Sequence, residues 1–356
     1  MSNYSPVFSQ WGFPVEPGQP LIIAGPCSAE SREQLLLTAN AMRSYPVHLF
    51  RAGVWTPRSH LEAAAGTGNV ALEWLQEVRQ ETGLKLAVEV ATPQQLKEVL
   101  QADIDVLWIG ARTTVNPFAV QELANALAGV DKPVLVKNPI TPDLEVWFGA
   151  MERLQNKGVK KLGVILRGFV HRRPSKWRFE PEWELARKFR SEFPSLPYIC
   201  DPSHIAGNAS MIQDICQQAM DLDYHGLMVE THYDPSRALS DVEQQLNPEQ
   251  LGELLSSLRL KPLGQPENPA EMELQSLRLE IDRIDQALLE NFAARLKLSQ
   301  RLGAVKKELR LLPLQSSRWN RVLQQAHEYG QQCGLSDAFI RDIFNRIRQE
   351  SIRQQE

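Results

Sequence analysis

Residues 85–110, KLAVEVATPQQLKEVLQADIDVLWIG, carry the pattern that decides the fold. An apolar run at 85–90 precedes a helix-like stretch at 94–100, and a second apolar run follows at 105–110. Near-continuous apolar runs of this kind are typical of parallel strands that are buried on both faces. A strand, a helix and a second strand form one βαβ unit, so this stretch predicts an α/β fold with a parallel sheet.

The same alternation extends from this stretch toward both ends of the chain. Eight apolar runs lie at residues 21–27, 47–54, 85–90, 105–110, 133–137, 161–167, 196–200 and 226–230. A helix-like stretch follows each run, at 34–42, 70–80, 94–100, 118–127, 144–155, 182–193, 209–220 and 248–258. Eight strand–helix units in about 250 residues predict a (β/α)8 TIM barrel. A doubly wound open sheet is the alternative, which the strict alternation disfavours. We expect residues 1–20 to cover the barrel floor.

The character of the sequence changes after residue 260. Residues 261–270, KPLGQPENPA, hold three prolines and a glycine and predict a linker. The remaining residues, 271–356, are rich in Leu, Arg, Glu and Gln. They predict a small all-α domain with helices at about 271–311, 316–332 and 336–354. We therefore assign residues 1–260 to the barrel, 261–270 to a linker and 271–356 to a helical domain.

The first helix of the second domain is long for so small a domain. Forty residues with a rise of about 1.5 Å each span about 60 Å. Two further helices offer too little surface to cover its apolar stripe, so we expect an intertwined homodimer. The stripe consists of Leu274, Leu277, Ile281, Ile284, Leu288, Leu289 and Phe292.

Composition excludes several classes of function. The 356 residues carry a net charge of −4, which is not the footprint of a nucleic-acid-binding protein. No apolar run approaches about 18 residues, so we expect no transmembrane helix and no membrane partner. The first residues lack the pattern of a signal peptide. The four cysteines are scattered without a CxxC pair, which is typical of a reduced, cytoplasmic protein.

Five cationic residues stand at the ends of predicted strands or just beyond them. They are Arg51, Arg58, Arg112, Lys137 and Arg167. In a barrel of this kind the carboxyl ends of all strands meet at one mouth, where active sites lie. Buried cations need anions. Five of them at one mouth therefore predict substrates that carry phosphate and carboxylate groups, held by bidentate arginines.

A second set of strand-end residues has the chemistry of metal ligands. Cys27, His204 and Glu230 end three strands, and Asp241 lies in the loop after the last one. A thiolate, an imidazole and two carboxylates suit a divalent transition metal. Ligands from separate strands do not have the short spacing of structural zinc sites. The set predicts an exchangeable catalytic metal that acts as a Lewis acid on a carbonyl group.

Short motifs at these strand ends form an ordered set. They are GPCS at 25–28, PRS at 57–59, GAR at 110–112, VKNP at 136–139, LRG at 166–168, CDPSH at 200–204, VETH at 229–232 and LSD at 239–241. In these motifs residues 20–260 resemble 3-deoxy-D-arabino-heptulosonate 7-phosphate (DAHP) synthases, transferases that open the shikimate pathway to aromatic amino acids. The resemblance implies condensation of phosphoenolpyruvate with erythrose 4-phosphate and release of phosphate.

The resemblance also implies a role for each residue. Metal ligands would be Cys27, His204, Glu230 and Asp241, binding one ion of Mn, Co, Zn or Fe. Phosphoenolpyruvate would be held by Arg51, Arg112, Lys137 and Arg167, and the sugar phosphate by Arg58 and Ser59. The metal would polarise the aldehyde while C3 of the enol attacks it. Lys137, Glu89 or a metal-bound water would manage the protons when water adds to C2.

One position departs from the synthase pattern. The family usually has a lysine in a Lys-Pro-Arg-Thr segment, and this chain has Thr56 in WTPRS, followed by an unusual loop at 60–69. A lost ammonium group beside two phosphorylated substrates should weaken binding or slow the reaction. The related octulosonate 8-phosphate synthases share the barrel and are the alternative. They usually carry an asparagine at this place, which the segment 55–59 lacks.

The helical domain carries its own set of cations. Arg295 and Lys306 are 11 residues apart, about three turns, so they share a helix face. Arg278 precedes Lys306 by 28 residues, roughly 42 Å along a helix. No small substrate reaches both of these side chains. If all of them serve one site together with Arg318, Arg278 must come from another chain.

These residues lie in segments that resemble the all-helical chorismate mutases, isomerases of the same pathway. The segments are LRLEIDRID at 277–285, AAR at 293–295, GAVK at 303–306, SSR at 316–318 and ESIRQQ at 350–355. The resemblance implies a homodimer that rearranges chorismate to prephenate. Carboxylates would be bound by Arg278, Arg295 and Arg318, and the ether oxygen by Lys306 and Gln355, with Ser351 also in the site. Trp319 and Gln315 replace a glutamate and an aspartate of some members, which affects the contact with the substrate hydroxyl.

A chain with both domains is expected to be bifunctional. The mutase product prephenate would be a feedback inhibitor of the synthase, acting through the linked helical domain. Two alternatives remain open. The helical domain could be a dimerisation and sensing module without mutase activity, or the mutase could be active on a barrel that has lost its own activity with the lysine at position 56.

Overall fold

A computed structural model describes residues 5–55, 67–171, 175–260, 269–310 and 316–354. The chain divides into two compact units, Met1–Glu280 and Ile281–Glu356. The boundary between these units falls inside one continuous helix. Each unit is therefore described by itself.

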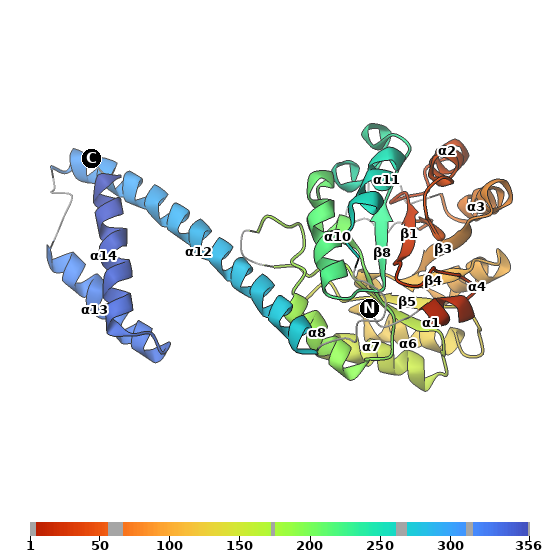
Figure 1. Ribbon diagram of the computed structural model, residues 1–356, viewed down its shortest axis with the longest axis horizontal. Coiled ribbons are helices and arrows are strands. Elements are labelled where there is room, and N and C mark those ends of the chain that lie inside the picture. The colour runs from red at the N-terminus through yellow and green to blue at the C-terminus, as the bar shows by residue number, and fades with distance from the viewer. Residues whose placement is uncertain (1–4, 56–66, 172–174, 261–268, 311–315, 355–356) are drawn as a thin grey trace. The chain divides into compact units, whose positions relative to one another are not determined.

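The first unit is the predicted barrel, in which eight parallel strands form one closed sheet (Figure 1). Each strand pairs with its neighbour in the sequence, and the first strand pairs with the last. The strands are β1 (Leu21–Gly25), β2 (Leu49–Ala52), β3 (Lys85–Val90), β4 (Val106–Ile109), β5 (Val134–Lys137), β6 (Leu162–Leu166), β7 (Tyr198–Cys200) and β8 (Gly226–Glu230). All eight lie within the apolar runs, so this prediction is confirmed.

Eight helices surround the strands, as predicted (Figure 1). They are α2 (Arg32–Met42), α3 (Asn69–Thr82), α4 (Pro93–Gln101), α6 (Pro117–Ala126), α7 (Leu144–Asn156), α8 (Trp183–Glu192), α10 (Ile212–Asp221) and α11 (Pro248–Ser257). Side chains cap several of them: Ser31, Thr92 and Asp143 each accept a hydrogen bond from a backbone N–H of the first turn. Such caps fix where a helix starts and therefore how long the preceding loop is.

Two short helices that we did not predict follow strand ends. They are α5 (Ala111–Thr114) after β4 and α9 (Pro202–Ala206) after β7. Each begins directly at a strand end, and each carries a predicted site residue, Arg112 on α5 and His204 on α9. A side chain on such a first turn is held closer to the mouth of the barrel than one on a long loop.

Two apolar layers hold the barrel together. The inner layer contains inward-facing strand residues such as Leu49, Trp108 and Ile165, all buried. Phe8 from α1 (Ser5–Gln10) and Phe13 belong to the same layer, so the segment before β1 packs against the barrel interior as expected. The outer layer lies between the strands and the surrounding helices. Burial on both faces explains why the strands read as unbroken apolar runs.

Three helices follow the barrel: α12 (Pro269–Glu308), α13 (Ser316–Gln332) and α14 (Asp337–Arg353). The prediction of one forty-residue helix and two shorter ones is confirmed. The first helix begins at Pro269, within the predicted linker, because proline is well tolerated in the first turn of a helix. Most of its predicted apolar stripe is exposed on this single chain, with Ile281 at 56% and Leu289 at 65% exposure. Among the described residues, no helix has the length and apolar character needed to cross a membrane.

Candidate active sites

The centre of the barrel site is a cluster of three predicted metal ligands. Ligand atoms of Cys27 after β1, Glu230 at the end of β8 and Asp241 in the following loop lie within 4.8 Å of one another. The Cys27 thiol donates a hydrogen bond to Asp241 Oδ2 at 3.3 Å. His204, the fourth predicted ligand, stands beside them with its Nε2 3.8 Å from Glu230 Oε1.

These donors fit a divalent transition metal. Glu230 is fully buried, and its Oε1 accepts no hydrogen bond among the described residues. A buried carboxylate is costly unless positive charge balances it, and Arg51 Nη1, 3.3 Å from Oε1, supplies part of that charge. Burial and the nearby carboxylates of Glu230 and Asp241 raise the pKa of the Cys27 thiol well above its usual value. A cation among these groups would relieve both costs.

Asp201 links the metal ligands to the cations, although we assigned it no role from the sequence. Its Oδ2 lies 2.9 Å from His204 Nδ1 and 2.7 Å from Lys137 Nζ. Burial raises the pKa of this carboxyl, but His204 and Lys137 outweigh burial and hold it well below its usual value. Asp201 therefore orients the imidazole so that Nε2 faces the cluster, as carboxylates do for histidine ligands in metal sites.

Three of the five predicted cations are buried around this cluster: Arg51 on β2, Lys137 on β5 and Arg167 after β6. Arg51 Nη1 lies 3.3 Å from Glu230 Oε1, and Arg51 Nη2 donates to the Cys27 carbonyl. Arg51 and Lys137 both lie over the ring of Trp108, with 5.0 and 5.9 Å to its centroid. The inner wall of the barrel therefore holds these charges close together.

Arg167 is prepared to receive an anion. Its guanidinium stacks on the ring of Phe179 at 3.5 Å, and Nη1 is buried with no hydrogen-bond partner among the described residues. Burial lowers the pKa of Arg167 to about 10. Its backbone is held by Asn138 of the VKNP motif, whose Oδ1 accepts the Arg167 N–H at 2.7 Å. A phosphate or carboxylate would satisfy the orphaned nitrogen.

The remaining predicted barrel residues fall into two groups. Arg112 lies on α5 at the same mouth and is exposed, and Glu89 lies on β3, where its carboxylate accepts a hydrogen bond from Trp108 at 2.8 Å. A Cβ on Gly110 would come within 2.1 Å of Glu89 Oε1, so glycine of the GAR motif leaves room for that carboxylate. Thr56, Arg58 and Ser59 lie outside the described residues.

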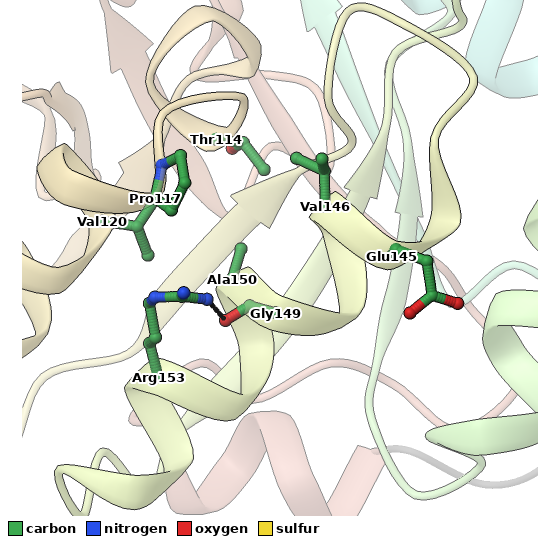
Figure 2. A pocket seen from close by; sticks show the side chains of 8 residues that line it. All are labelled: Thr114, Pro117, Val120, Glu145, Val146, Gly149, Ala150 and Arg153. Atoms are coloured by element: carbon green, nitrogen blue, oxygen red, sulfur yellow. Dashed lines mark hydrogen bonds between the residues drawn. The ribbon is translucent and has the colours of Figure 1, made fainter.

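A separate cavity of about 230 Å³ lies among α5, α6 and α7 (Figure 2). Arg153 donates to the Gly149 carbonyl there, and Glu145 also lines the cavity. None of the predicted site residues lines this cavity, so it is distinct from the cluster at the strand ends.

Among the described residues of the helical region, a hydrogen bond joins two predicted mutase residues. Arg295 on α12 donates to the Ser351 hydroxyl on α14 at 2.5 Å, and Ser351 is buried. Burial lowers the pKa of Arg295. Lys306 on α12 is half-buried, and Arg318 on α13 is exposed. Arg278 falls outside the unit Ile281–Glu356 that holds the others, and Gln315 and Gln355 lie outside the described residues.

Trp319, which replaces a glutamate of some mutases, has a partner of its own. The guanidinium of Arg348 on α14 lies over its ring, 4.8 Å from the centroid. Arg348 precedes Ser351 by three residues, so the two side chains share one face of α14. We did not single out Arg348 from the sequence, because one more arginine among many on these helices gave no distinguishing signal.

Two segments of the chain match known protein families. Residues 16–260, more than half of the chain, match the DAHP synthetase I family. The chain belongs to the DAHP synthetase I family. Residues 277–356 match chorismate mutase type II, so the same chain carries a chorismate mutase domain after its DAHP synthase domain.

Individual relatives agree with the family assignment. A phospho-2-dehydro-3-deoxyheptonate aldolase of Thermotoga maritima is 31% identical over 238 residues, which cover 67% of this chain and 68% of the relative. The crystal structure of such an enzyme (DAHP synthase) from T. maritima aligns with a TM-score of 0.61 at 30% identity, over 67% of this chain and 68% of the other. A 2-dehydro-3-deoxyphosphooctonate aldolase of Wolinella succinogenes is 24% identical, over 67% of this chain and 97% of the relative.

The barrel of this DAHP synthetase family member contains three further polar residues that sequence reasoning missed. Gln244 donates to Glu230 Oε2 at 2.7 Å, and Gln245 accepts the Cys27 N–H at 3.1 Å. They lie three and four residues after the LSD motif, which could have drawn attention to them. Arg178 contacts Asp241 Oδ1 at 2.8 Å, but in the sequence it is one of several cations in HRRPSKWR and looks like part of a solvated loop.

Proposed function

We propose that this chain is a bifunctional enzyme of the shikimate pathway. Its barrel condenses phosphoenolpyruvate with erythrose 4-phosphate to DAHP and phosphate, and its helical domain rearranges chorismate to prephenate. The family matches over residues 16–260 and 277–356 support these two reaction classes. The single observation that carries the barrel reaction is the meeting of the Cys27–Glu230–Asp241 cluster with buried Arg51, Lys137 and Arg167 at one end of the strands.

The buried cations suit phosphoenolpyruvate. This substrate carries a carboxylate and a phosphate, and Arg51 on β2, Lys137 on β5 and Arg167 after β6 offer fixed donors, with Arg112 at the mouth. Their stacking on Trp108 and Phe179 limits their motion, so little entropy is lost when the substrate binds. By the same proposal Arg58 and Ser59 hold the phosphate of the sugar.

The ligands proposed for one divalent ion (Mn, Co, Zn or Fe) are Cys27, His204, Glu230 and Asp241. A metal bound there would supply Lewis-acid polarisation of the sugar aldehyde. The chain's own residues arrange the rest. Asp201 holds His204 with Nε2 toward the cluster, and Arg51 offsets the charge of Glu230. Clustered thiol and carboxylate donors would bind a metal with release of the thiol proton.

Proton handling falls to Lys137 and Glu89. Lys137 Nζ is shared with Asp201 in a buried pair, and Glu89 shares the Trp108 neighbourhood with it. We propose that these two groups manage the protons when water adds to C2 of phosphoenolpyruvate. Their positions at the same barrel mouth support this role.

For the mutase reaction we propose charge stabilisation without covalent chemistry. Arg295, Arg318 and Arg278 would bind the two carboxylates of chorismate, and Lys306 and Gln355 would face the ether oxygen where negative charge develops. Ser351 fixes the Arg295 guanidinium, because its hydroxyl accepts the hydrogen bond at 2.5 Å. Trp319 stands where some members have a glutamate, and the guanidinium of Arg348 lies over its ring.

Three finer points belong to the same proposal. We propose a homodimer through the helical domain, because the apolar stripe of α12 is exposed on a single chain. Prephenate is proposed as the feedback inhibitor of the synthase, since the mutase site binds a later intermediate of the pathway. A cytoplasmic location fits a biosynthetic enzyme of this family. Addition of prephenate to a synthase assay of the full chain should lower the rate, and an unchanged rate would remove the feedback from the proposal.

The decisive experiment measures both activities on the purified full chain, with and without a chelator. Release of phosphate from phosphoenolpyruvate should require erythrose 4-phosphate, and chorismate should be consumed at a comparable protein concentration. Mutase activity without synthase activity would indicate that the barrel has lost its function. Synthase activity without mutase activity would make the helices a dimerisation and sensing module. A preference for a five-carbon sugar phosphate would favour the octulosonate reaction, because an eight-carbon product needs five carbons besides the three of phosphoenolpyruvate.

A further inference from the structure

We propose that Arg178 and Gln244 are positioning residues that hold the carboxylates of Asp241 and Glu230 in their metal-binding orientation. This inference rests on the metal site proposed above. Neither residue belongs to the predicted ligands, and neither is needed to explain the barrel fold.

The contacts of these two residues form one connected path. Arg178 Nη1 donates to Asp241 Oδ1 at 2.8 Å and to Gln244 Oε1 at 2.5 Å. Gln244 in turn donates through Nε2 to Glu230 Oε2 at 2.7 Å. One guanidinium nitrogen therefore fixes one proposed ligand directly and a second one through the glutamine amide.

Each of these contacts uses only one oxygen of the carboxylate. Asp241 keeps Oδ2 toward the Cys27 thiol at 3.3 Å, and Glu230 keeps Oε1 without a hydrogen bond among the described residues. Arg178 and Gln244 therefore leave Asp241 Oδ2 and Glu230 Oε1 for the proposed ion, and Oε1 also lies 3.3 Å from Arg51 Nη1. Outer hydrogen bonds that occupy one oxygen and leave the other toward the site are typical of the support around metal ligands.

The backbone holds the positioning residue Gln244 close to the proposed ligand Asp241. Gln244 is buried at 1% exposure and ends a short 3₁₀ turn, Val242–Gln244. Asp241, which caps that turn, has the left-handed φ of +47°, a conformation that asparagine and aspartate adopt more readily than most residues. The Gln244 N–H donates to the Asp241 carbonyl at 3.2 Å, so the two residues are held together in one turn.

Arg178 is fixed by a different element. Its side-chain stem packs on Gly207, where an added Cβ would lie 2.4 Å from Arg178 Cβ. Gly207 ends α9, the helix that carries His204, and its φ of +67° also favours glycine. The neighbouring Phe179 N–H donates to the Ile205 carbonyl of α9 at 3.2 Å. The segment of Arg178 is therefore tied to the element that positions a third proposed ligand.

The contacts of Gln244 require a side chain that can both accept and donate a hydrogen bond. Its amide must accept from Arg178 and donate to Glu230 at the same time. A glutamate of the same shape could accept from Arg178, but it could not donate and would place a second negative charge beside Glu230. Gln244→Glu is therefore a nearly isosteric test of the proposal.

Arg178 has an alternative role, as one more cation that binds substrate at the mouth of the barrel. Its side chain is 45% exposed, and its guanidinium lies 5.6 Å from the centroid of the Phe179 ring on which Arg167 stacks. The two roles predict different effects of a substitution at Arg178. A positioning residue changes the affinity for the metal in the absence of substrate, whereas a substrate cation changes KM for phosphoenolpyruvate and leaves metal affinity alone.

The test is a metal titration of the full chain without substrates. Co²⁺ is added to chelator-treated protein, the dissociation constant is measured by competition with a chromophoric chelator, and the thiolate-to-cobalt absorption band reports Cys27. We expect Gln244→Glu and Arg178→Ala each to weaken Co²⁺ binding by about 10–100-fold. Arg178→Lys should recover part of the loss, because an ammonium can still donate to both oxygens.

Matched controls share the substitution but not the contacts. Gln250→Glu changes a glutamine that caps α11, and Arg187→Ala removes an exposed arginine that pairs with Glu184. Both should bind Co²⁺ with the affinity of the parent chain. If Gln244→Glu does not fold, the variants of the half-exposed Arg178 decide the outcome alone.

The outcomes separate this inference from the proposed function. Parental affinity in both Arg178→Ala and Gln244→Glu, with binding lost in Cys27→Ala, would overturn the positioning role and leave the metal site standing. Binding and absorption band retained in Cys27→Ala would remove the proposed metal site itself. An Arg178→Ala variant with unchanged Co²⁺ affinity and a raised KM for phosphoenolpyruvate would make Arg178 a substrate cation and overturn the inference.

Discussion

Lys137 Nζ and Asp201 Oδ2 form a buried ion pair at 2.7 Å, and the same oxygen lies 2.9 Å from His204 Nδ1. One carboxylate thus faces both a cation proposed for phosphoenolpyruvate and a histidine proposed for the metal. The two sets of residues that the sequence suggested are therefore parts of one hydrogen-bonded site, with Asp201 between them.

The variant Asp201→Asn tests how strongly the Lys137–Asp201 ion pair stabilises the folded chain. The amide keeps the shape but leaves the Lys137 ammonium buried without its counter-charge, so we expect unfolding free energy to fall by about 3–5 kcal/mol. Lys137→Met in the same background should restore part of that loss, because the unpaired charge is then gone. Denaturant unfolding of the two single variants and the double variant measures the coupling. Additive losses within about 0.5 kcal/mol would show that the pair is not energetically coupled.

Removal of metal should separate the two activities. All proposed ligands lie in the barrel, and the mutase reaction needs only cations and hydrogen bonds. Thorough chelation, or Cys27→Ala, should lower synthase activity by more than about 100-fold, since a ligand matters at least as much as its outer partners. Mutase activity, measured on the same sample by chorismate consumption, should stay near that of the parent. A synthase rate that survives metal removal would contradict the site assignment.

The buried His225 and the half-buried His48 predict how barrel stability depends on pH. His225 and His48 each accept a backbone N–H through Nδ1, from Tyr198 at 2.8 Å and Ile22 at 3.1 Å. Burial, together with the charge of Arg190 for His225, lowers the pKa of His225 well below its usual value, and burial lowers that of His48. As pH falls below about 6.5 the unfolded chain takes up protons that the folded chain refuses, so stability is lost toward acid.

His225→Asn tests the larger of these effects. The asparagine oxygen can still accept the Tyr198 N–H, but the side chain no longer binds a proton in the unfolded chain. Between pH 6 and pH 5 the slope of unfolding free energy should decrease by up to about 1.4 kcal/mol per pH unit. Denaturant unfolding at several pH values measures the slope, and His171→Asn in the same barrel is the matched control. An identical slope in parent and His225→Asn would contradict the prediction.

The barrel could be predicted because one local pattern, an apolar run followed by a helix-like stretch, repeats along the chain. Strands buried on both faces must be apolar throughout, and all eight apolar runs contain one strand. The sequence predicted that Cys27 and Glu230 lie close together, because the carboxyl ends of parallel strands meet at one mouth. The exposed apolar stripe and forty-residue length of α12 also follow from simple periodicity.

The support around the site could not be predicted in the same way. Arg178 meets Asp241 across 63 residues of sequence, and both lie in loops whose paths depend on the packing of α9. Trp319 meets Arg348 between two helices, where nothing in the spacing singles out the pair. Such contacts depend on tertiary geometry, whereas strand-end motifs depend on position along the chain.

The missing lysine gives a prediction that depends on sequence alone. If Thr56 occupies the usual lysine position, Thr56→Lys should leave KM for the phosphorylated substrates equal or lower it by up to about tenfold. A hydrogen bond to a charged group contributes about 1.5 kcal/mol. Thr56→Met, which adds length without charge, is the control and should not lower KM. Complete loss of synthase activity in Thr56→Lys would show that the positional match is wrong.

Exchange of subunits tests where Arg278 acts. Arg278→Ala and Arg295→Ala should each be nearly inactive as mutases, because each removes a proposed carboxylate ligand. In a symmetric dimer whose sites each take Arg278 from the partner, a mixed dimer of the two variants has one intact site and one doubly altered site. Random exchange makes half of the dimers mixed, so roughly a quarter of parental mutase activity should return. Chorismate consumption, followed after mixing and after exchange has been verified with a mass label, measures the recovery. No recovery despite complete exchange would place Arg278 in the site of its own chain, because a mixed dimer would then contain no intact site.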